Sequence, residues 1–169
     1  AIVAAADLIV EAFRTGAKLL LCGNGGSAAD CQHMATEFVS RFTKDFERPG
    51  LPAIALTTDS SFLTAYANDC GFDGIFERQV EALGRPGDVL IGISTSGNSP
   101  NVLKGVDAAR ACGLTTIGWT GGTGGKLAGL VEYLFVVPST VTARIQESHI
   151  TLGHVLCELI EEQILGKAP

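Results

Sequence analysis

The sequence lacks several features that would assign it to a broad class of protein. It contains no apolar run of about 18 residues, the length that a membrane-spanning helix needs. Its 12 Lys and Arg residues are outnumbered by 18 Asp and Glu, and a net charge of −6 argues against a general nucleic-acid binder. No signal peptide is recognisable. We therefore expect no membrane span and no nucleic-acid partner.

The cysteines lack the pairing pattern of a disulfide framework or a redox motif. There are five of them, an odd number, and none forms a C-x-x-C pair; they are Cys22, Cys31, Cys70, Cys112 and Cys157. Scattered, unpaired cysteines are typical of reduced thiols. The pattern predicts a cytoplasmic protein.

What the chain has in abundance is apolar surface. Hydrophobic residues make up 46% of its 169 residues, and the mean hydropathy is +0.30, which is high for a soluble monomer. The length fits a single domain over residues 1–169. Because no membrane span absorbs the apolar surface, we expect it to contact other subunits. The sequence starts at Ala1 inside an apolar-periodic segment, so we expect that an upstream segment is missing.

Solidly apolar runs alternate with amphipathic segments, which predicts a doubly wound α/β fold with a parallel sheet and helices on both faces. The predicted strands are Lys18–Cys22, Ala53–Leu56, Val89–Ile93, Leu114–Ile117 and Tyr133–Val137. The predicted helices cover residues 2–13, 28–42, 59–67 and 75–83, one beginning at Pro100, and 140–165. A glycine-rich segment, 121–125, is expected to be another strand-to-helix turn.

The central strand ends in a loop of hydroxyl, amide and glycine residues, Ser94 to Ser99, with no lysine or arginine inside it. Ser99 fits a helix N-cap and Pro100 the first helical position. Unpaired N–H groups and the helix dipole favour an anion here, most plausibly a phosphate. The alternative is an ordinary polar turn.

A second polar loop, Gly23 to Ala28, follows the first strand. It can be forced into the dinucleotide-binding fingerprint, but the acidic residue expected about 20 positions later is absent. The glycines instead favour close approach of the backbone to a smaller ligand, with Ser27 pointing into it. A tight turn without a ligand is the competing interpretation. Both loops follow parallel strands, so they should share one crevice.

Two helices carry side chains that suit metal binding or proton transfer. His33 and Glu37 lie four residues apart and so face one side of their helix, although a solvated pair is the simpler interpretation. Gln146 and His154 fall within one quadrant of the last helix, whereas His149 lies elsewhere on it. Two imidazoles, a carboxylate and an amide oxygen suit a divalent metal, with zinc the leading candidate. Spacing alone does not bring the two helices together.

Several long motifs, recurring in order, resemble the sugar isomerase (SIS) family, and within it the members that act on sedoheptulose 7-phosphate. The resemblance covers about Gly16 to Leu165, and it rests on CGNGGSAADCQHMATEF, PAIALTTD, ANDCGF, RPGDVLIGISTSGNSPNV, TGGTGGKLA and ARIQESHITLGHVLCELIE. Relatives carry a further helix upstream of the segment that begins here at Ala1, and it helps to build their tetramer. Some members have an aspartate just before the arginine of the last motif, whereas this chain has Thr142 and Ala143.

The resemblance implies a three-layer sandwich around a five-stranded parallel sheet, a homotetramer, and active sites at subunit interfaces. It implies one Zn²⁺ per subunit, with the ligands falling on His33, Glu37, Gln146 and His154. It also implies that Glu37 is the base and His154 the acid. The implied substrate contacts are Asn24, Gly25, Gly26, Ser27, Glu37, Asn68, Asp69, Ser94, Thr95, Ser96, Ser99 and Gln146.

The implied reaction is aldose–ketose isomerisation of sedoheptulose 7-phosphate to D-glycero-D-manno-heptose 7-phosphate, at the entry to bacterial heptose precursors. We expect Glu37 and His154 to face the crevice in which both polar loops lie. Some SIS relatives are instead scaffolds that bind the replication initiator, and in those the positions of Glu37 and His154 are replaced. Others are sugar-phosphate sensors, which usually carry a DNA-binding domain. The presence of both Glu37 and His154 favours the enzyme.

Overall fold

The protein is described by a computed structural model over residues 1–45 and 47–166, and its centre is one parallel sheet. The strands are β1 (Leu19–Gly23), β2 (Ala53–Ala55), β3 (Val89–Ile93), β4 (Thr115–Gly121) and β5 (Tyr133–Val137). They lie side by side in the order β2-β1-β3-β4-β5, and every pairing is parallel. The predicted five-stranded parallel sheet is confirmed.

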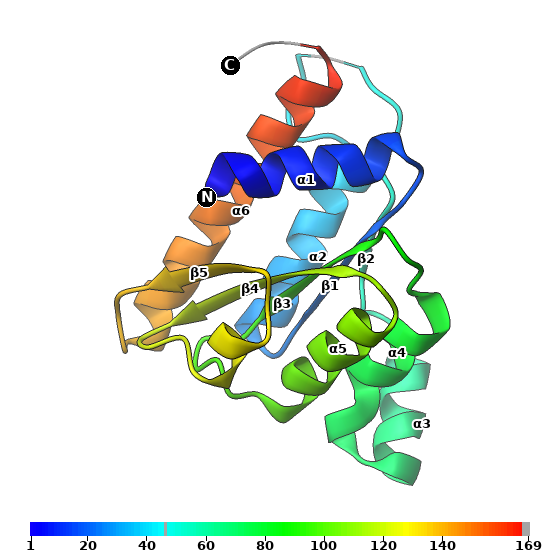
Figure 1. Ribbon diagram of the computed structural model, residues 1–169, viewed down its shortest axis with the longest axis vertical. Coiled ribbons are helices and arrows are strands. Elements are labelled where there is room, and N and C mark those ends of the chain that lie inside the picture. Colours follow the sequence, from blue (N-terminus) through cyan, green and yellow to red (C-terminus); the bar gives the residue numbers. More distant parts are fainter. Residues whose placement is uncertain (46, 167–169) are drawn as a thin grey trace.

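Helices cover both faces of this sheet, as Figure 1 shows. One layer contains α1 (Ile2–Arg14), α2 (Gly26–Val39) and α6 (Thr142–Ile164). The other contains α3 (Ser60–Cys70), α4 (Ile75–Leu83) and α5 (Pro100–Ala111). Because both faces are covered, every residue of β1 and β3 is buried, which is why these strands are continuously apolar.

Several boundaries differ from the sequence-based prediction. Helix α3 extends from Ser60 to Cys70 rather than over residues 59–67, so Asn68 and Asp69 lie within its last turn. Helix α2 ends at Val39 rather than at Phe42, and β4 continues through Gly121 rather than stopping at Ile117. The glycine-rich segment after β4 leads to a short 3₁₀ helix, Lys126–Gly129, and not to an α-helix. Only residues 122–132 connect β4 to β5, which is short for a helical crossover between parallel strands.

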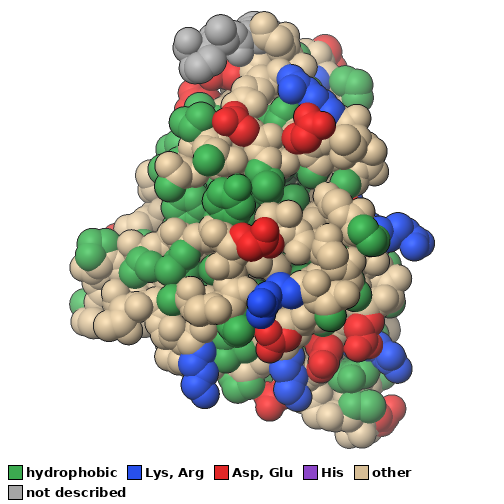
Figure 2. All heavy atoms as spheres, in the orientation of Figure 1, with side chains coloured by type: hydrophobic (Ala, Val, Ile, Leu, Met, Phe, Trp, Pro, Cys, Tyr) green, Lys and Arg blue, Asp and Glu red, His purple; other side chains and the backbone are tan. Residues whose placement is uncertain are grey.

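Apolar side chains also reach the surface. On the face shown in Figure 2 they gather between α1 and α5, while acidic and basic side chains are interspersed over the lower part of the molecule. Large exposed hydrophobic residues in the described chain include Val3, Val39, Ile54, Phe72 and Val141. None of the helices described is both long and apolar enough to cross a membrane.

Candidate active site

The loop from Ser94 to Ser99, which we call the hydroxyl cradle, joins the end of β3 to the start of α5. The Ser94 side chain is buried, and its Oγ lies 2.9 Å from Oγ of Ser99. Gly97 has φ +65°, a conformation that favours glycine, and its N–H donates to the carbonyl of Ser94. The cradle therefore wraps tightly at the N-terminus of α5, where backbone geometry favours an anion.

The glycine-rich loop after β4 supports the cradle from one side. A Cβ on Gly97 would collide with the carbonyl oxygen of Gly124, so the two backbones pack directly against each other. Leu127 N–H donates to the carbonyl of Gly97 at 2.9 Å, and Lys126 N–H donates to Oδ1 of Asn98 at 3.1 Å. The shape of the cradle is thus set by two loops that are far apart in the sequence.

The loop after β1 is tied to the first turn of α5, next to the cradle, by an amide pair. Asn24 Nδ2 donates to Asn101 Oδ1 at 2.9 Å, and Asn101 Nδ2 donates to Asn24 Oδ1 at 2.8 Å. Asn101 is only 2% exposed and lies on the first turn of α5. The sequence analysis did not identify Asn101. A signal was available, because Asn101 is an amide residue that directly follows Pro100 and so lies on the first helical turn, beside the crevice. The pair confirms that the two polar loops are neighbours.

Two further predicted residues lie at the same edge. Ser27 is 3% exposed, on the first turn of α2. The Gln146 side chain of α6 lies over Gly26, so closely that a Cβ on Gly26 would collide with the amide. Gly25, which precedes α2, has φ +56°. Asn24, Gly25, Gly26, Ser27 and Gln146 therefore surround one part of the crevice.

His33, Glu37 and His154 also come together, because α2 and α6 pack against each other. Nε2 of His33 lies 2.9 Å from Nε2 of His154 and 3.4 Å from Oε1 of Glu37. His33 and His154 are exposed and Glu37 is half-buried. The spacing of these residues in the sequence did not show that the two imidazoles and the carboxylate lie next to one another.

His33 lies at the middle of α2, and Glu37 lies toward the end that is far from the glycine loop. Glu37 is ten residues after Ser27, which corresponds to about 15 Å along the helix. The His154 ring packs on Phe42, just beyond the end of α2, with ring centroids 5.8 Å apart. The expectation that Glu37 and His154 face the crevice in which both polar loops lie stays a prediction.

The same geometry bears on the predicted metal site. The two imidazole nitrogens and the carboxylate oxygen are donors that suit zinc, and they converge on one another. Gln146 lies eight residues, about 12 Å along α6, before His154, with its amide on Gly26. Over the described residues, no group of three or more His, Cys, Asp or Glu side chains has the arrangement of a metal site. His33 therefore contacts both His154 and Glu37, and the metal site itself, with Gln146 as its fourth ligand, stays a prediction.

The assignment of Asn68 and Asp69 to the substrate stays a prediction. They lie at the end of α3, both exposed, and Asn68 Nδ2 donates to Asp69 Oδ1 at 2.8 Å. Helix α3 has no buried residue, and its Leu63 lines a hollow of about 130 Å³ together with Gly23, Asn24 and Gly25. The side chains of Asn68 and Asp69 are available to another molecule.

Two buried groups beside the site are held neutral by their surroundings. Burial raises the pKa of the Cys157 thiol to about 12, and the nearby Glu37 and Glu161 carboxylates raise it too. Burial lowers the pKa of His149, against a hydrogen bond to the Thr120 carbonyl, which lies 3.2 Å from Nε2. His149 is therefore a core residue that fastens α6 to β4.

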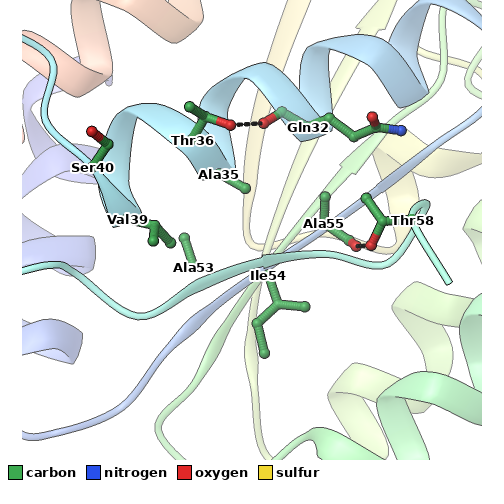
Figure 3. A pocket seen from close by; sticks show the side chains of 9 residues that line it. All are labelled: Gln32, Ala35, Thr36, Val39, Ser40, Ala53, Ile54, Ala55 and Thr58. Atoms are coloured by element: carbon green, nitrogen blue, oxygen red, sulfur yellow. Dashed lines mark hydrogen bonds between the residues drawn. The ribbon is translucent and has the colours of Figure 1, made fainter.

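Two hollows have different chemistry. One of about 290 Å³ adjoins the cradle and is lined by Thr95, Ser96, Gly121, Gly122, Thr123, Ser139, Thr140, Thr142 and Ile145. Another, of about 430 Å³, lies between α2 and the edge strand β2, as Figure 3 shows. Its lining is mostly small and apolar, and no predicted site residue contributes to it. The hydroxyl-rich hollow, which continues the cradle, is better suited to a sugar.

Comparisons with known proteins agree with this architecture. The SIS domain family matches residues 1–121. The chain is 61% identical to a phosphoheptose isomerase of Roseiflexus sp. (strain RS-1), over 96% of this chain and 82% of that protein. It is 63% identical to a phosphoheptose isomerase of Aquifex aeolicus (strain VF5), over 99% of this chain and 86% of that protein.

A solved structure gives the same result. Phosphoheptose isomerase from Neisseria gonorrhoeae superposes with a TM-score of 0.89 and 49% identity, over 95% of this chain and 85% of that one. Sequence and fold thus agree over nearly the whole chain. The chain belongs to the phosphoheptose isomerase family of SIS domain proteins.

Proposed function

We propose that this protein is an aldose–ketose isomerase that converts sedoheptulose 7-phosphate to D-glycero-D-manno-heptose 7-phosphate, which supplies heptose precursors for bacterial surface glycans. The observation that carries the proposal is the identity of 61% and 63% to two proteins named phosphoheptose isomerase, over nearly all of this chain. The retained Glu37 and His154 favour an enzyme over a binding scaffold.

The phosphate group is assigned to the hydroxyl cradle. Ser94, Thr95, Ser96 and Ser99 provide hydroxyls beside the N-terminus of α5, whose dipole favours negative charge. Asn24, Gly25, Gly26, Ser27 and Gln146 are assigned to the sugar. A fixed grip on the phosphate matters because the reacting carbons must be placed within about 1 Å.

The chemical step is a proton transfer between C1 and C2. In this proposal the Glu37 carboxylate removes the proton from C1 of the ketose while His154 donates a proton to the oxygen on C2, which gives an enediol. Return of a proton to C2 and loss of the proton on the C1 hydroxyl then give the aldose. A base and an acid of this kind each contribute about 10²–10⁴-fold to the rate.

A divalent metal, zinc by preference, is proposed for His33, Glu37 and His154, with Gln146 as the fourth ligand. The convergence of the first three side chains supports it. When bound, the metal would supply a Lewis acid that polarises the substrate carbonyl. Elemental analysis of protein purified without chelator should find about one zinc per chain.

We further propose a homotetramer in which each active site uses more than one subunit. Glu37 lies about 15 Å along α2 from Ser27, so a second copy is the natural source of the acid–base pair that meets a given cradle. The exposure of Asn68 and Asp69 supports the same arrangement, and so do exposed apolar residues such as Val39 and Ile54. A cytoplasmic location is proposed from the five free cysteines.

The test is turnover of sedoheptulose 7-phosphate, followed by appearance of the aldose, before and after treatment with a chelator. The proposal predicts turnover by the untreated protein, loss after chelation and recovery with zinc. Undiminished turnover by metal-free protein would remove the metal from the mechanism. No turnover under any of these conditions would overturn the isomerase assignment.

A further inference from the structure

A buried arginine lies directly behind the proposed base. Arg48 belongs to the loop between α2 and β2, and its side chain is only 2% exposed. Its guanidinium donates to the backbone carbonyl of Glu37 at 2.7 Å from Nη2, and to that of Phe38 at 2.8 Å from Nη1. Arg48 therefore fixes the backbone of Glu37 without contacting its carboxylate.

The end of α2 explains why a cation is useful there. The last carbonyls of a helix have no partner within the helix, and the negative end of its dipole favours a positive charge. The last turn of α2 contains no basic residue. Arg48, which returns from the following loop, supplies both the hydrogen-bond donors and the charge.

Glu161 of α6 completes the arrangement. Its Oε1 accepts from Nε of Arg48 at 2.7 Å and from the N–H of Phe42 at 3.0 Å, and its Oε2 accepts from the N–H of Thr43 at 2.9 Å. The Glu161 side chain is 5% exposed. Glu161 thus binds the backbone of Phe42, and the Phe42 ring packs on His154.

The Arg48–Glu161 pair therefore fastens both members of the proposed acid–base pair. One end of the pair holds the backbone of Glu37, and the other holds the residue against which His154 rests. Buried ion pairs are often replaceable by apolar residues without loss of stability, so stability alone does not account for one here. The accurate placement of Glu37 and His154 would account for the pair, because a displacement of about 1 Å at a reacting group can cost about 10²-fold in rate.

Resting on the function proposed above, we infer that Arg48 and Glu161 are positioning residues that set the geometry of Glu37 and His154. Neither needs to touch the sugar phosphate. Their loss should affect the reacting end of the site, while the phosphate grip at the hydroxyl cradle remains. The expected signature is therefore a fall in kcat with KM little changed.

The chain offers a matched control. Asp88, 3% exposed on its side chain, pairs with Lys18 and also accepts from the backbone N–H groups of Lys18 at 2.9 Å and Arg85 at 2.8 Å. This is the same kind of buried carboxylate with one cation and two backbone donors. It joins the starts of β1 and β3 and not α2 and α6. Lys18→Met thus removes a comparable ion pair from another place in the fold.

The experiment compares Arg48→Met, Arg48→Lys, Glu161→Gln and Lys18→Met at a temperature where circular dichroism shows each one folded. Arg48→Met should lower kcat about 10- to 100-fold with KM within about threefold of wild type. Arg48→Lys, which keeps the charge but not the forked donors, should recover part of the loss. Lys18→Met should keep kcat within about twofold. If Arg48→Met does not fold, Glu161→Gln is judged by the same criteria.

Ring NMR signals of His33 and His154 give a readout that needs no turnover. They should shift in Arg48→Met and stay in place in Lys18→Met. Wild-type kcat in a folded Arg48 variant, or an equal loss in Lys18→Met, overturns the inference. A wild-type protein that does not isomerise the sugar overturns the proposed function instead, while the ring signals still decide whether Arg48 positions the pair.

Discussion

Ser94 and Ser99 show how single residues turn the end of a strand into a binding loop. Their hydroxyls lie 2.9 Å apart across the cradle, and Ser96 Oγ accepts from the N–H of Asn98 at 3.2 Å. Small side chains leave the backbone and the hydroxyls accessible. A phosphate in the proposed site would therefore be held by neutral donors rather than by a lysine or arginine of the cradle.

Removing two of these hydroxyls should weaken the grip on the phosphate. Ser96→Ala with Ser99→Ala is expected to raise KM for sedoheptulose 7-phosphate at least tenfold, because a hydrogen bond to a charged group contributes about 1.5–3 kcal/mol. Steady-state kinetics measure the change. Ser148→Ala is the control, since the Ser148 hydroxyl donates to the carbonyl of Arg144 on the surface of α6. An unchanged KM in the double variant would mean that the phosphate binds elsewhere.

At the residue scale, the sequence predicted the candidate site best where a short stretch of residues has a distinctive chemistry. The hydroxyls of the cradle and the glycines of the first turn were found because their chemistry is local. Asn101 and Arg48 were missed, because each acts through a partner 77 and 11 residues away in the sequence. Nothing in the neighbouring residues distinguishes a buried Arg48 from an ordinary loop arginine.

At the scale of elements, the packing of α2 on α6 decides the site. Strands β3 and β5 have the predicted bounds, because their apolar runs are sharply ended by polar residues or proline. The end of α2 was placed three residues too late, at Phe42 instead of Val39. The apolar periodicity continues to Phe42. The backbone N–H groups of Phe42 and Thr43, however, donate to the Glu161 carboxylate rather than to carbonyls of the helix.

The Glu161 carboxylate should make the free energy of unfolding depend on pH in the acidic range. Burial alone would raise its pKa, but hydrogen bonds from Phe42, Arg48 and Thr43 bring it below the ordinary value of 4.5. A carboxylate whose pKa is lowered on folding stabilises the protein above its unfolded pKa, and this stabilisation is lost as pH falls through the folded pKa. Relative to wild type, Glu161→Gln should lose on the order of 2 kcal/mol in the free energy of unfolding at about pH 7.

Denaturant titrations at about pH 7 and about pH 3 measure this difference, which should shrink at the lower value. Glu81→Gln is the control, because Glu81 forms an exposed ion pair with Arg78. Its effect should stay within about 0.5 kcal/mol at both pH values. A difference between wild type and Glu161→Gln that is constant with pH would contradict the assigned charge state.

At the scale of the whole molecule, the alternation of strands and helices was enough to predict the fold class. The strand order β2-β1-β3-β4-β5 was not predicted, because it depends on which faces the crossovers take. The position of Glu37 relative to the cradle also depends on the direction of α2, which runs away from the carboxyl ends of the strands. In our proposal, Glu37 and the cradle of one chain are too far apart to act on the same substrate molecule.

Assembly should resolve this separation. Light scattering at micromolar concentration should report a mass of four chains, each of 17.6 kDa. A partner subunit would then bring its Glu37 and His154 to the cradle of the first. Mixing Glu37→Gln with Ser96→Ala/Ser99→Ala protein should restore activity in hybrid tetramers, since some sites then contain both intact parts. A fully active monomer would contradict the shared-site arrangement.

The central claim, isomerisation with Glu37 as the base, is tested most directly by the turnover of Glu37→Gln together with its affinity for sedoheptulose 7-phosphate. Glutamine keeps the shape and an oxygen atom of glutamate but cannot accept the C1 proton. We predict that kcat falls by about 10²–10⁴-fold while the dissociation constant for the sugar phosphate changes little. Turnover by Glu37→Gln within a few-fold of wild type would contradict the account.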